Sequence, residues 1–247
     1  MDNKKVLEIA LHQQAIDFNC KPEDFYLTEN KVVISKENPE ARKYLKLPVF
    51  CALASFGNNV VASVNPTIAD FVLDYINTHK IEDCFAPPNL FVLNQELEKH
   101  DSIISFSAQR TLPDIELIKP LSCEYDIKVL HPDDYAYLYS IPEWNDVIGN
   151  KERKHLDSLA VGAFDNHNLI GFAGSRAYCD KMTQIGIEVL PDYRKKGVAA
   201  ALTSRLALEI LNTGAIPYSG NVWGNIPSLK TQLACGFKLA WIEMQTS

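Results

Sequence analysis

Hydrophobic and polar positions along the first 80 residues predict a mixture of helix and strand. The first twenty residues repeat apolar positions with a period near 3.6, which predicts an amphipathic helix over about 4–18. "FYLTENKVVIS" predicts a hairpin turning at 28–30, and "VFCALASFGNNVVASVN" predicts a second hairpin turning at 57–59. Pro66 then fits the first turn of a helix that runs to about Thr78.

Prolines mark the middle of the chain. After Pro87-Pro88 we predict a short strand at "NLFVLN", a helix from about Gln95 and a strand at "SIISFS". The following segment, "TLPDIELIKPLSCEYD", carries two prolines and no helical period. We therefore place a domain boundary there, which gives an N-terminal domain over 1–122 and a C-terminal domain over 123–247.

The pattern of the C-terminal half is sharper. It predicts a strand at "DIKVL", a helix to about Ser140, a second helix over about 143–156, two strands joined by a turn at 165–168, and a third strand at "MTQIGIEVL". Apolar residues every fourth position predict an amphipathic helix from Lys195 to about Asn212, closed by Gly214. A strand, a short helix and a closing strand at "GFKLAWIEM" complete the domain.

Composition narrows the functional classes. The chain has 247 residues, 47% of them hydrophobic and 22% charged, which excludes disorder. The net charge of −7 lies in the first half, since residues 1–126 hold 12 Lys and Arg against 19 Asp and Glu. Neither half is basic enough for nucleic-acid binding, and no apolar run is long enough to span a membrane. The six cysteines lack metal-ligand or C-x-x-C spacing, which predicts reduced thiols, a cytoplasmic location and no metal site.

One stretch carries candidate chemistry. In "PDYRKKGVAAAL", Arg194, Lys195 and Lys196 stand at the expected start of a helix, where acidic residues are normally preferred. A glycine at such a turn allows close approach, and the first helical amides have no partner within the helix. These features together predict a site for an anion, above all a diphosphate. The spacing fits neither a P-loop nor a Rossmann fingerprint.

The same stretch resembles the signature of the GNAT superfamily of acyl-CoA-dependent N-acyltransferases. The motif [R/Q]-x-x-G-x-[A/G] is matched by 194–199, and V-x-P-x-x-R is matched from Val189 through Pro191 to Arg194. Downstream, N-x-x-S-x(7)-G-F is matched by 225–237. The resemblance covers about 127–247. It implies a GNAT fold, with a central mixed sheet whose two middle strands splay apart between flanking helices.

This resemblance implies acetyl-CoA as co-substrate and assigns residues to it. The expected cofactor-binding residues are Ile187, Glu188, Val189, Arg194, Lys195, Lys196, Gly197, Val198, Ala199, Asn225 and Ser228. The strand residues 187–189 would contact the pantetheine arm, and the amides of 195–199 would hold the diphosphate. Asn225 also suits a helix N-cap, and the two roles are compatible.

The reaction that the resemblance implies is direct attack of an amine on the thioester. Glu188 is our candidate general base, with a surface strand residue paired to a cation as the alternative. The family often has a tyrosine as the acid for the departing thiolate, and Gln232 stands at that position here. Tyr139 and Trp144 flank a proline break and are candidates for the wall of the acceptor site.

We therefore predict a cytoplasmic two-domain α/β N-acetyltransferase that acetylates a primary amine, most simply of a small molecule. A non-catalytic acyl-CoA-binding regulatory module is the alternative, motivated by Gln232. The N-terminal domain is predicted to be mixed α/β, either a degenerate copy of the same fold or an unrelated unit. We expect no nucleic-acid or membrane partner, and the sequence leaves oligomeric state open, a homodimer included.

Overall fold

The computed structural model describes residues 1–148 and 151–246. Its contacts group the chain into two compact units. Unit 1 comprises Met1–Val6, Thr111–Gly220 and Asn225–Lys238, and unit 2 comprises Leu7–Arg110, Asn221–Gly224 and Leu239–Ser247. Each unit combines three separate segments of the chain, whereas the sequence-based prediction is a single cut at residue 122. The cut remains our prediction for where the domain with the chemistry begins.

Unit 2 is a small sheet covered by helices on both faces. Its strands β1 (Lys31–Ile34), β3 (Val61–Val64), β2 (Cys51–Ser55) and β10 (Phe237–Thr246, from Leu239 onward) lie in that order. β1 pairs with β3 in parallel, and β2 pairs antiparallel with both β3 and β10. The other elements are α1 (Asn3–Phe18), η1 (Pro22–Phe25), η2 (Pro66–Ile68), α2 (Ala69–Thr78), α3 (Ile81–Cys84), α4 (Asn89–Glu98) and β4 (Ile104–Pro113).

Cover on both faces explains why the central strands β2 and β3 carry no charged residue. Leu53 and Ala62 point into a cluster with Val72 of α2 and Leu93 of α4. Their neighbours along the strands point to the opposite face, where α1 packs on them. Because both faces are covered, both β2 and β3 are fully buried.

Two predictions for this half are wrong. The run at 28–30 does not turn a hairpin, because β1 pairs with β3 and the Asn30 side chain donates to the Ile76 carbonyl at 2.6 Å. "NLFVLN" is not a strand, because it lies in α4, whose residues Leu93 and Leu97 are buried four positions apart. The helix from 4 to 18, the hairpin at 57–59, and the helix after Pro66 are confirmed.

Unit 1 is a second mixed sheet with helices on both faces. Its strands lie in the order β9 (Ile216–Asn221), β8 (Met182–Val189), β7 (Asn168–Arg176), β6 (Asp157–Asp165) and β5 (Asp126–Leu130). All neighbours are antiparallel except β8 and β9, which are parallel. The remaining elements are α5 (Pro132–Tyr135), η3 (Ala136–Ser140), η4 (Pro142–Trp144), α6 (Asn145–Ile148), η5 (Lys151–Leu156), η6 (Pro191–Tyr193), α7 (Val198–Asn212) and α8 (Ile226–Ala234).

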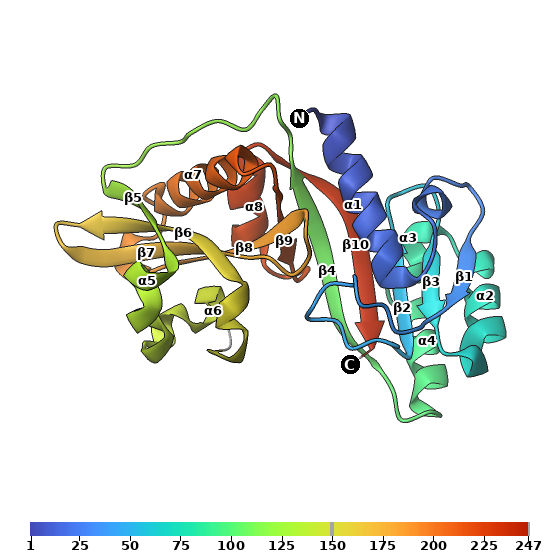
Figure 1. The fold of residues 1–247 in the computed structure, drawn as a ribbon. Coiled ribbons are helices and arrows are strands. Elements are labelled where there is room, and N and C mark those ends of the chain that lie inside the picture. Colours follow the sequence, from blue (N-terminus) through green and yellow to red (C-terminus); the bar gives the residue numbers. More distant parts are fainter. Residues whose placement is uncertain (149–150, 247) are drawn as a thin grey trace. The chain divides into compact units, whose positions relative to one another are not determined.

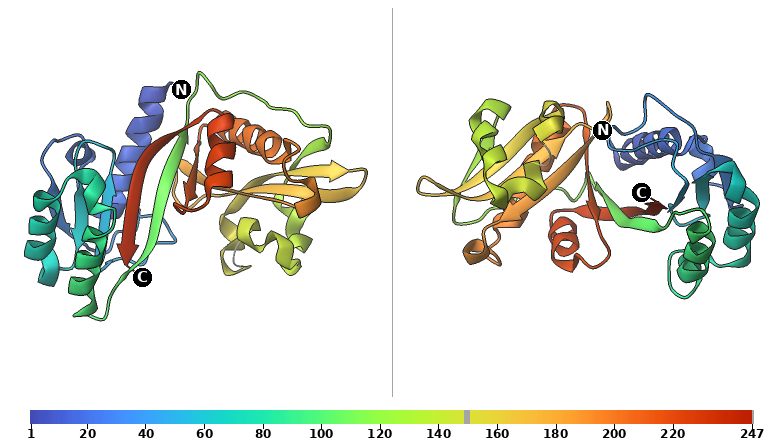
Figure 2. Two further views of the ribbon diagram at one scale, coloured as in Figure 1. Left: turned by 180° about the vertical axis from the view of Figure 1, so that it is seen from behind. Right: turned by 90° about the horizontal axis from the view of Figure 1, so that it is seen from below.

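The two faces of this sheet have different cover. α7 lies along β6, β7 and β8 on one face, where Leu202 and Leu206 pack on Ile185 (Figure 1). α5 and α6 lie on the other face, as the further views also show (Figure 2). There Trp144 and Phe172 belong to one buried cluster. The predicted mixed α/β fold of this half, a sheet flanked by helices, is confirmed.

The segment expected to form one helix over 143–156 is broken into short pieces. Its described parts are a turn over Pro142–Trp144, one turn of α-helix over Asn145–Ile148 and a 3₁₀ segment over Lys151–Leu156. Residues 149 and 150 lie outside the described residues. Within the described ranges, no helix is both long enough and apolar enough to cross a membrane.

Candidate functional site

The three cations lie in a turn and not in the first turn of the helix. β8 ends at Val189, η6 follows, and α7 begins only at Val198. The expected start at Lys195 is therefore wrong by three residues. Lys195 and Gly197 both have positive φ, at 64° and 81°, and this conformation turns the chain into α7. The three cationic residues therefore lie outside α7, although they remain next to its N-terminus, which carries partial positive charge.

The start of α7 presents main-chain donors. The first bond into the helix runs from the Ala201 amide to the Gly197 carbonyl, at 3.0 Å. The amides of residues 198–200 therefore have no acceptor within the helix. Gly197 is the N-cap and provides no side chain to occupy them. An anion beside this turn would meet these amides directly.

Arg194 and Lys196 already have partners in the protein. The Arg194 guanidinium donates to the Val189 carbonyl and to the Glu188 carboxylate, each at 2.9 Å. The Lys196 ammonium lies 5.2 Å from the centroid of the Tyr193 ring. Lys195 is exposed, and within the described part of the chain it forms no ion pair. It is therefore the cation of the three that is most available to a ligand.

Two tyrosines that sequence reasoning missed flank this turn. Tyr125 and Tyr193 pack edge to face with centroids 5.4 Å apart, and the Tyr125 hydroxyl lies 3.4 Å from the Lys196 ammonium. The Tyr193 hydroxyl donates to Asp165 at 3.0 Å, and this hydrogen bond raises the pKa of Tyr193. Tyr193 lies within the quoted motif, but no sequence pattern indicated that Tyr125 would join it.

The two middle strands of unit 1 separate, as the resemblance implies. β8 and β9 pair at three successive positions, and the last pair is Gln184 with Tyr218. β8 runs on for five residues beyond that pair, to Val189, and stays paired only with β7. The edge of β8 that faces β9 is therefore open over 185–189.

Alternation decides which main-chain groups line the open edge. The Leu190 amide donates to the Ile170 carbonyl at 2.9 Å, so alternate residues back along β8, including Glu188, bond toward β7. Ile187 and Val189 therefore direct their amides and carbonyls toward the open edge. Two of the three residues predicted to contact pantetheine, Ile187 and Val189, therefore present main-chain groups at the open edge. The main-chain groups of Glu188 point toward β7, so that only its side chain could contact a ligand.

Glu188 is part of a small closed network. Its carboxylate accepts from Arg194 and, at 3.1 Å, from the Val189 amide, so that these two side chains cover the outermost main-chain groups of the open edge. The Glu188 side chain is 28% exposed. It pairs across the sheet with Phe172, and so it lies on the face covered by α5 and α6. The alternative interpretation, pairing with a nearby cation, describes this geometry, and the base role stays a prediction.

Asn225 and Ser228 lie at the start of α8. Asn225 caps the helix, because its side-chain oxygen accepts from the Ser228 amide at 3.3 Å. One turn later, Gln232 is only 1% exposed. Its carbonyl oxygen accepts from the Thr111 hydroxyl at 2.7 Å, and its amide nitrogen donates to Ser219 at 2.6 Å. The side chain in the expected acid position is thus fixed by its neighbours and has no proton to transfer.

The predicted acceptor wall is partly buried. Trp144 is 4% exposed and its ring lies 6.2 Å from that of Phe172. Tyr139 is half-buried, and its hydroxyl donates to Asp157, which also pairs with Arg176 at 3.2 Å. Burial first, and then this hydrogen bond, raise the pKa of Tyr139 well above its usual range. Tyr139 therefore stays protonated, and the wall stays a prediction.

The glycine of the "GF" pair closes unit 1. Gly236 has φ of 90°, and a Cβ there would lie 2.8 Å from main-chain atoms of Leu117 and Ile118. Its carbonyl accepts from the Asp114 amide at 2.9 Å, and the Asp114 carboxylate pairs with Lys238. The residue at this position must be glycine for packing reasons, independently of any ligand.

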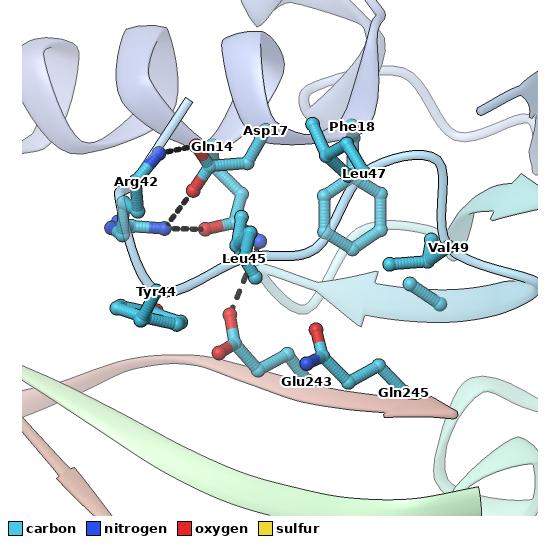
Figure 3. A pocket seen from close by; sticks show the side chains of 11 residues that line it. Gln14, Asp17, Phe18, Arg42, Tyr44, Leu45, Leu47, Val49, Glu243 and Gln245 are labelled. Carbon is cyan, nitrogen blue, oxygen red and sulfur yellow. Dashed lines mark hydrogen bonds and ion pairs between the residues drawn. The ribbon is translucent and has the colours of Figure 1, made fainter. Parts of the chain in front are cut away.

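A polar pocket in unit 2 is not a second site. Asp17 pairs with Arg42 (Figure 3). Arg110 pairs with Glu243 at 2.6 Å, so the buried charges balance. Burial alone would raise the pKa of Glu243, but the two arginines outweigh it and lower that pKa. The free volume is about 10 Å³, about the space of one water molecule. Gln14 joins Arg42 to the same network at 2.9 Å.

Among the described residues, no group of three or more His, Cys, Asp or Glu side chains could hold a metal.

Solved structures of acetyltransferases are similar to the chain at low identity. A putative GNAT acetyltransferase of Novosphingobium aromaticivorans DSM 12444 is 16% identical, with 59% of this chain and 66% of that chain covered and a TM-score of 0.48. A GCN5-related N-acetyltransferase-like protein of Streptococcus suis 89/1591 is 19% identical, with 66% and 69% covered and a TM-score of 0.47. An aminoglycoside N-acetyltransferase in complex with CoA is 23% identical, with 47% and 92% covered and a TM-score of 0.37. The chain thus spans about two thirds of the first two of these proteins.

No curated relative matches the sequence. Residues 123–237 match the model of the family described as "Acetyltransferase (GNAT) family". This segment contains the turn, the open strand edge and the helix described above. Residues 123–237 thus form a segment that matches the GNAT acetyltransferase family, in agreement with the resemblance of the motif at 194–199.

Proposed function

We propose that the chain transfers the acetyl group of acetyl-CoA to a primary amine of a small molecule, by direct attack in a ternary complex. The observation that carries this proposal is the meeting of two open features at one turn. The free amides of α7 begin within ten residues of the open edge of β8, and both lie beside the three cations. One elongated ligand with a diphosphate and an amide-containing arm fits both.

The turn and the strand would share the coenzyme. The amides of 195–199 would hold the diphosphate, with Lys195 as an added charge. The main-chain groups of Ile187 and Val189 would pair with the amides of the pantetheine arm, as one strand edge pairs with another. Asn225 and Ser228 lie at the start of α8 and are our candidates for contacts farther along the arm.

Arg194 is the residue whose contacts must change in this arrangement. It occupies the Val189 carbonyl and the Glu188 carboxylate, both of which belong to the proposed site. A diphosphate at the turn offers the guanidinium a doubly accepting anion, the geometry that arginine binds best. Transfer of Arg194 to the diphosphate would release the Val189 carbonyl for the arm and the Glu188 carboxylate for catalysis.

Acetyl-CoA supplies the activated acyl group, and the chain supplies positioning and proton transfer. The amine nitrogen forms the new bond to the acyl carbon, the carbon–sulfur bond breaks, and the amine loses a proton. Glu188 is our proposed acceptor of that proton, directly or through one water, because its carboxylate is partly exposed beside the open edge. No covalent intermediate on the protein is needed.

The acceptor would approach on the face covered by α5 and α6, where the Glu188 side chain lies. Tyr139 and Trp144 remain our candidates for the wall of that site. Because Trp144 is buried, we expect it to act by supporting the wall and Tyr139 to be the one that reaches the acceptor. All six cysteines are free, which supports the proposed cytoplasmic location.

A non-catalytic acyl-CoA-binding module is the second candidate, and Gln232 favours it. The Gln232 side-chain amide, held by Thr111 and Ser219, occupies the position where the family often has a tyrosine that donates a proton. In that case the chain would bind the coenzyme in the same way and release it unchanged.

The two candidates differ in thiol release. The purified chain is incubated with acetyl-CoA and a panel of amino sugars, polyamines, amino acids and amine antibiotics while free thiol is followed. Release with one or more amines supports the enzyme, whereas tight CoA binding without release on the whole panel supports the binding module. Calorimetry that detects no binding of CoA or acetyl-CoA to folded protein would contradict both.

A further inference from the structure

A buried cluster of hydroxyl groups lies where β8 and β9 separate. Tyr218 is the last β9 residue that pairs with β8, so Ser219 is the first β9 residue beside the opening. Side chains alternate along a strand, which places Ser219 on the opposite face from Tyr218. Its bond to Gln232 of α8 confirms that direction. Ser219 is only 4% exposed, although it adjoins the open edge.

Gln232 fixes two hydroxyl groups in one place. Its amide nitrogen donates to the Ser219 oxygen at 2.6 Å and to the Ser228 oxygen at 3.4 Å. Its own carbonyl oxygen is held by the Thr111 hydroxyl at 2.7 Å. The amide therefore cannot turn without losing a buried bond, and leaving such a group unsatisfied is costly.

The directions of these bonds leave two protons to donate. The Thr111 hydroxyl donates its proton to the Gln232 carbonyl oxygen, whereas the oxygens of Ser219 and Ser228 both accept from the Gln232 amide nitrogen. Each serine hydroxyl carries one donor proton and can accept as well. Within the described part of the chain, no acceptor accompanies either serine proton. A donor that is nine-tenths buried and has no acceptor indicates that a ligand completes the cluster.

We propose that Ser219 and Ser228 donate hydrogen bonds to the departing sulfur of CoA, and that Gln232 is the positioning residue that aims them. This inference rests on the proposed function, because it places the thioester where β8 and β9 separate. As the carbon–sulfur bond breaks, its electron pair stays on sulfur, and the two hydroxyls stabilise the thiolate without transferring their protons. The thiolate takes its proton from water after release, while the amine proton goes to Glu188.

Two donors are sufficient for this leaving group. A thiol has an ordinary pKa near 8.5, so its anion needs only modest stabilisation at neutral pH. Hydrogen bonds to a charged group are stronger than those between neutral groups. The cluster would therefore assist departure of the sulfur although it contains no acid of suitable pKa. The same contacts favour the bound thiolate over the bound thiol, which gives a signal independent of turnover.

The test is the pKa of the CoA thiol bound to the full chain, followed through the ultraviolet absorbance of the thiolate. In the unaltered protein we expect this pKa to be lower than in free CoA. Ser219→Ala and Ser228→Ala should each raise it by about one unit, the size of a hydrogen bond to a charged group. Gln232→Leu should raise it as well, because both hydroxyls lose their alignment.

Thr231→Ala is the matched control. Its hydroxyl donates to the Pro227 carbonyl of the same helix at 3.0 Å and is exposed, so the bound thiol pKa should not change. Ser228 is less buried than Ser219, so its variant keeps the test valid if Ser219→Ala does not fold. CoA that binds with a thiol pKa equal in all variants would overturn the inference alone. Absence of CoA binding to the unaltered protein would overturn the proposed function and this inference with it.

Discussion

The strand–turn–helix of unit 1 has a counterpart in unit 2. β8 ends in Val189, and Pro191 follows after one intervening residue; β3 ends in Val64, and Pro66 likewise follows after one intervening residue. In both places the proline opens a 3₁₀ turn, and a helix follows. The two turns differ in how their main-chain donors are satisfied, and this difference is the basis for proposing a binding site in unit 1 and not in unit 2.

In unit 2 every part of the turn is closed. The side chain of Asn65 accepts from the Thr67 amide at 3.0 Å, and α2 begins directly after the 3₁₀ turn. β3 pairs with β1 on one edge and with β2 on the other, over all four residues. In unit 1 the turn is longer, the N-cap Gly197 has no side chain to accept from the free amides, and β8 has one open edge. The unit 1 turn therefore leaves main-chain groups without partners that the corresponding turn of unit 2 does not leave.

The largest expected effect comes from the glycine of the open turn. Gly197→Ala should weaken CoA binding about 10- to 100-fold, because alanine resists a φ of 81° and the turn would move its amides. Calorimetry with CoA measures this directly. A Cβ at this position would have 3.8 Å of clearance, so folding should survive.

The other end of the same helix provides the matched control. Gly214 has φ of 85° and nothing within 4 Å of an added Cβ. Gly214→Ala should destabilise the protein by about 1 kcal/mol through the same backbone strain and leave CoA affinity unchanged. Equal loss of affinity in both variants would mean that helix stability, and not the amide pocket, governs binding.

A substitution in the turn between β3 and α2 should lower the stability of the protein and leave CoA affinity unchanged. Asn65→Ala removes the cap of the unit 2 turn and should lower the free energy of unfolding by about 1 kcal/mol. Urea denaturation gives the change in stability, and CoA titration should give an unchanged Kd. A weaker Kd would show that unit 2 contributes to the coenzyme site.

Acid should weaken unit 1 through Asp114. The hydrogen bond from Lys238, and then that from Asn3, lower the pKa of Asp114 to about 2. A carboxylate with a lowered folded pKa stabilises the protein above its ordinary pKa near 4, and this contribution disappears as the pH falls toward 2. Chemical denaturation between pH 5 and about 2.5 should show a steeper loss for the unaltered protein than for Asp114→Asn. Parallel curves would remove this contact from the stability of unit 1.

The smallest expected effect is that of Lys195. It is exposed and near a helix N-terminus, so Lys195→Ala should weaken CoA binding only about two- to fivefold, an effect that added salt should reduce. The salt dependence of Kd measures the charge contribution. A loss as large as that of Gly197→Ala would show that charge outweighs the main-chain donors.

The sequence predicted most elements of unit 1 because its patterns are long. β8 and α7 each carry a clear period over eight or more residues, and the motif places the glycine at the turn between them. "NLFVLN" failed as a strand because six residues are too few to show a period of 3.6. Leu97, which reveals the helical spacing with Leu93, lies outside that window.

The chemistry of the site was only partly predictable. The glycine turn before α7 follows from local sequence, but the Arg194–Glu188 pair depends on how that turn folds back on β8. The Thr111 hydroxyl meets Gln232 across 121 positions of sequence, which no local pattern reveals. Local motifs thus find the main-chain site, whereas side-chain networks require the fold.

Hydrogen exchange of the full chain, with and without CoA, tests the central claim most directly. Main-chain amides that bind a diphosphate and a pantetheine arm must exchange more slowly when the ligand is present. We predict new protection of the amides at 185–189 and at 195–200, and none at 61–72, the corresponding turn of unit 2. CoA that binds without protecting 195–200, or that protects both turns alike, would contradict the claim.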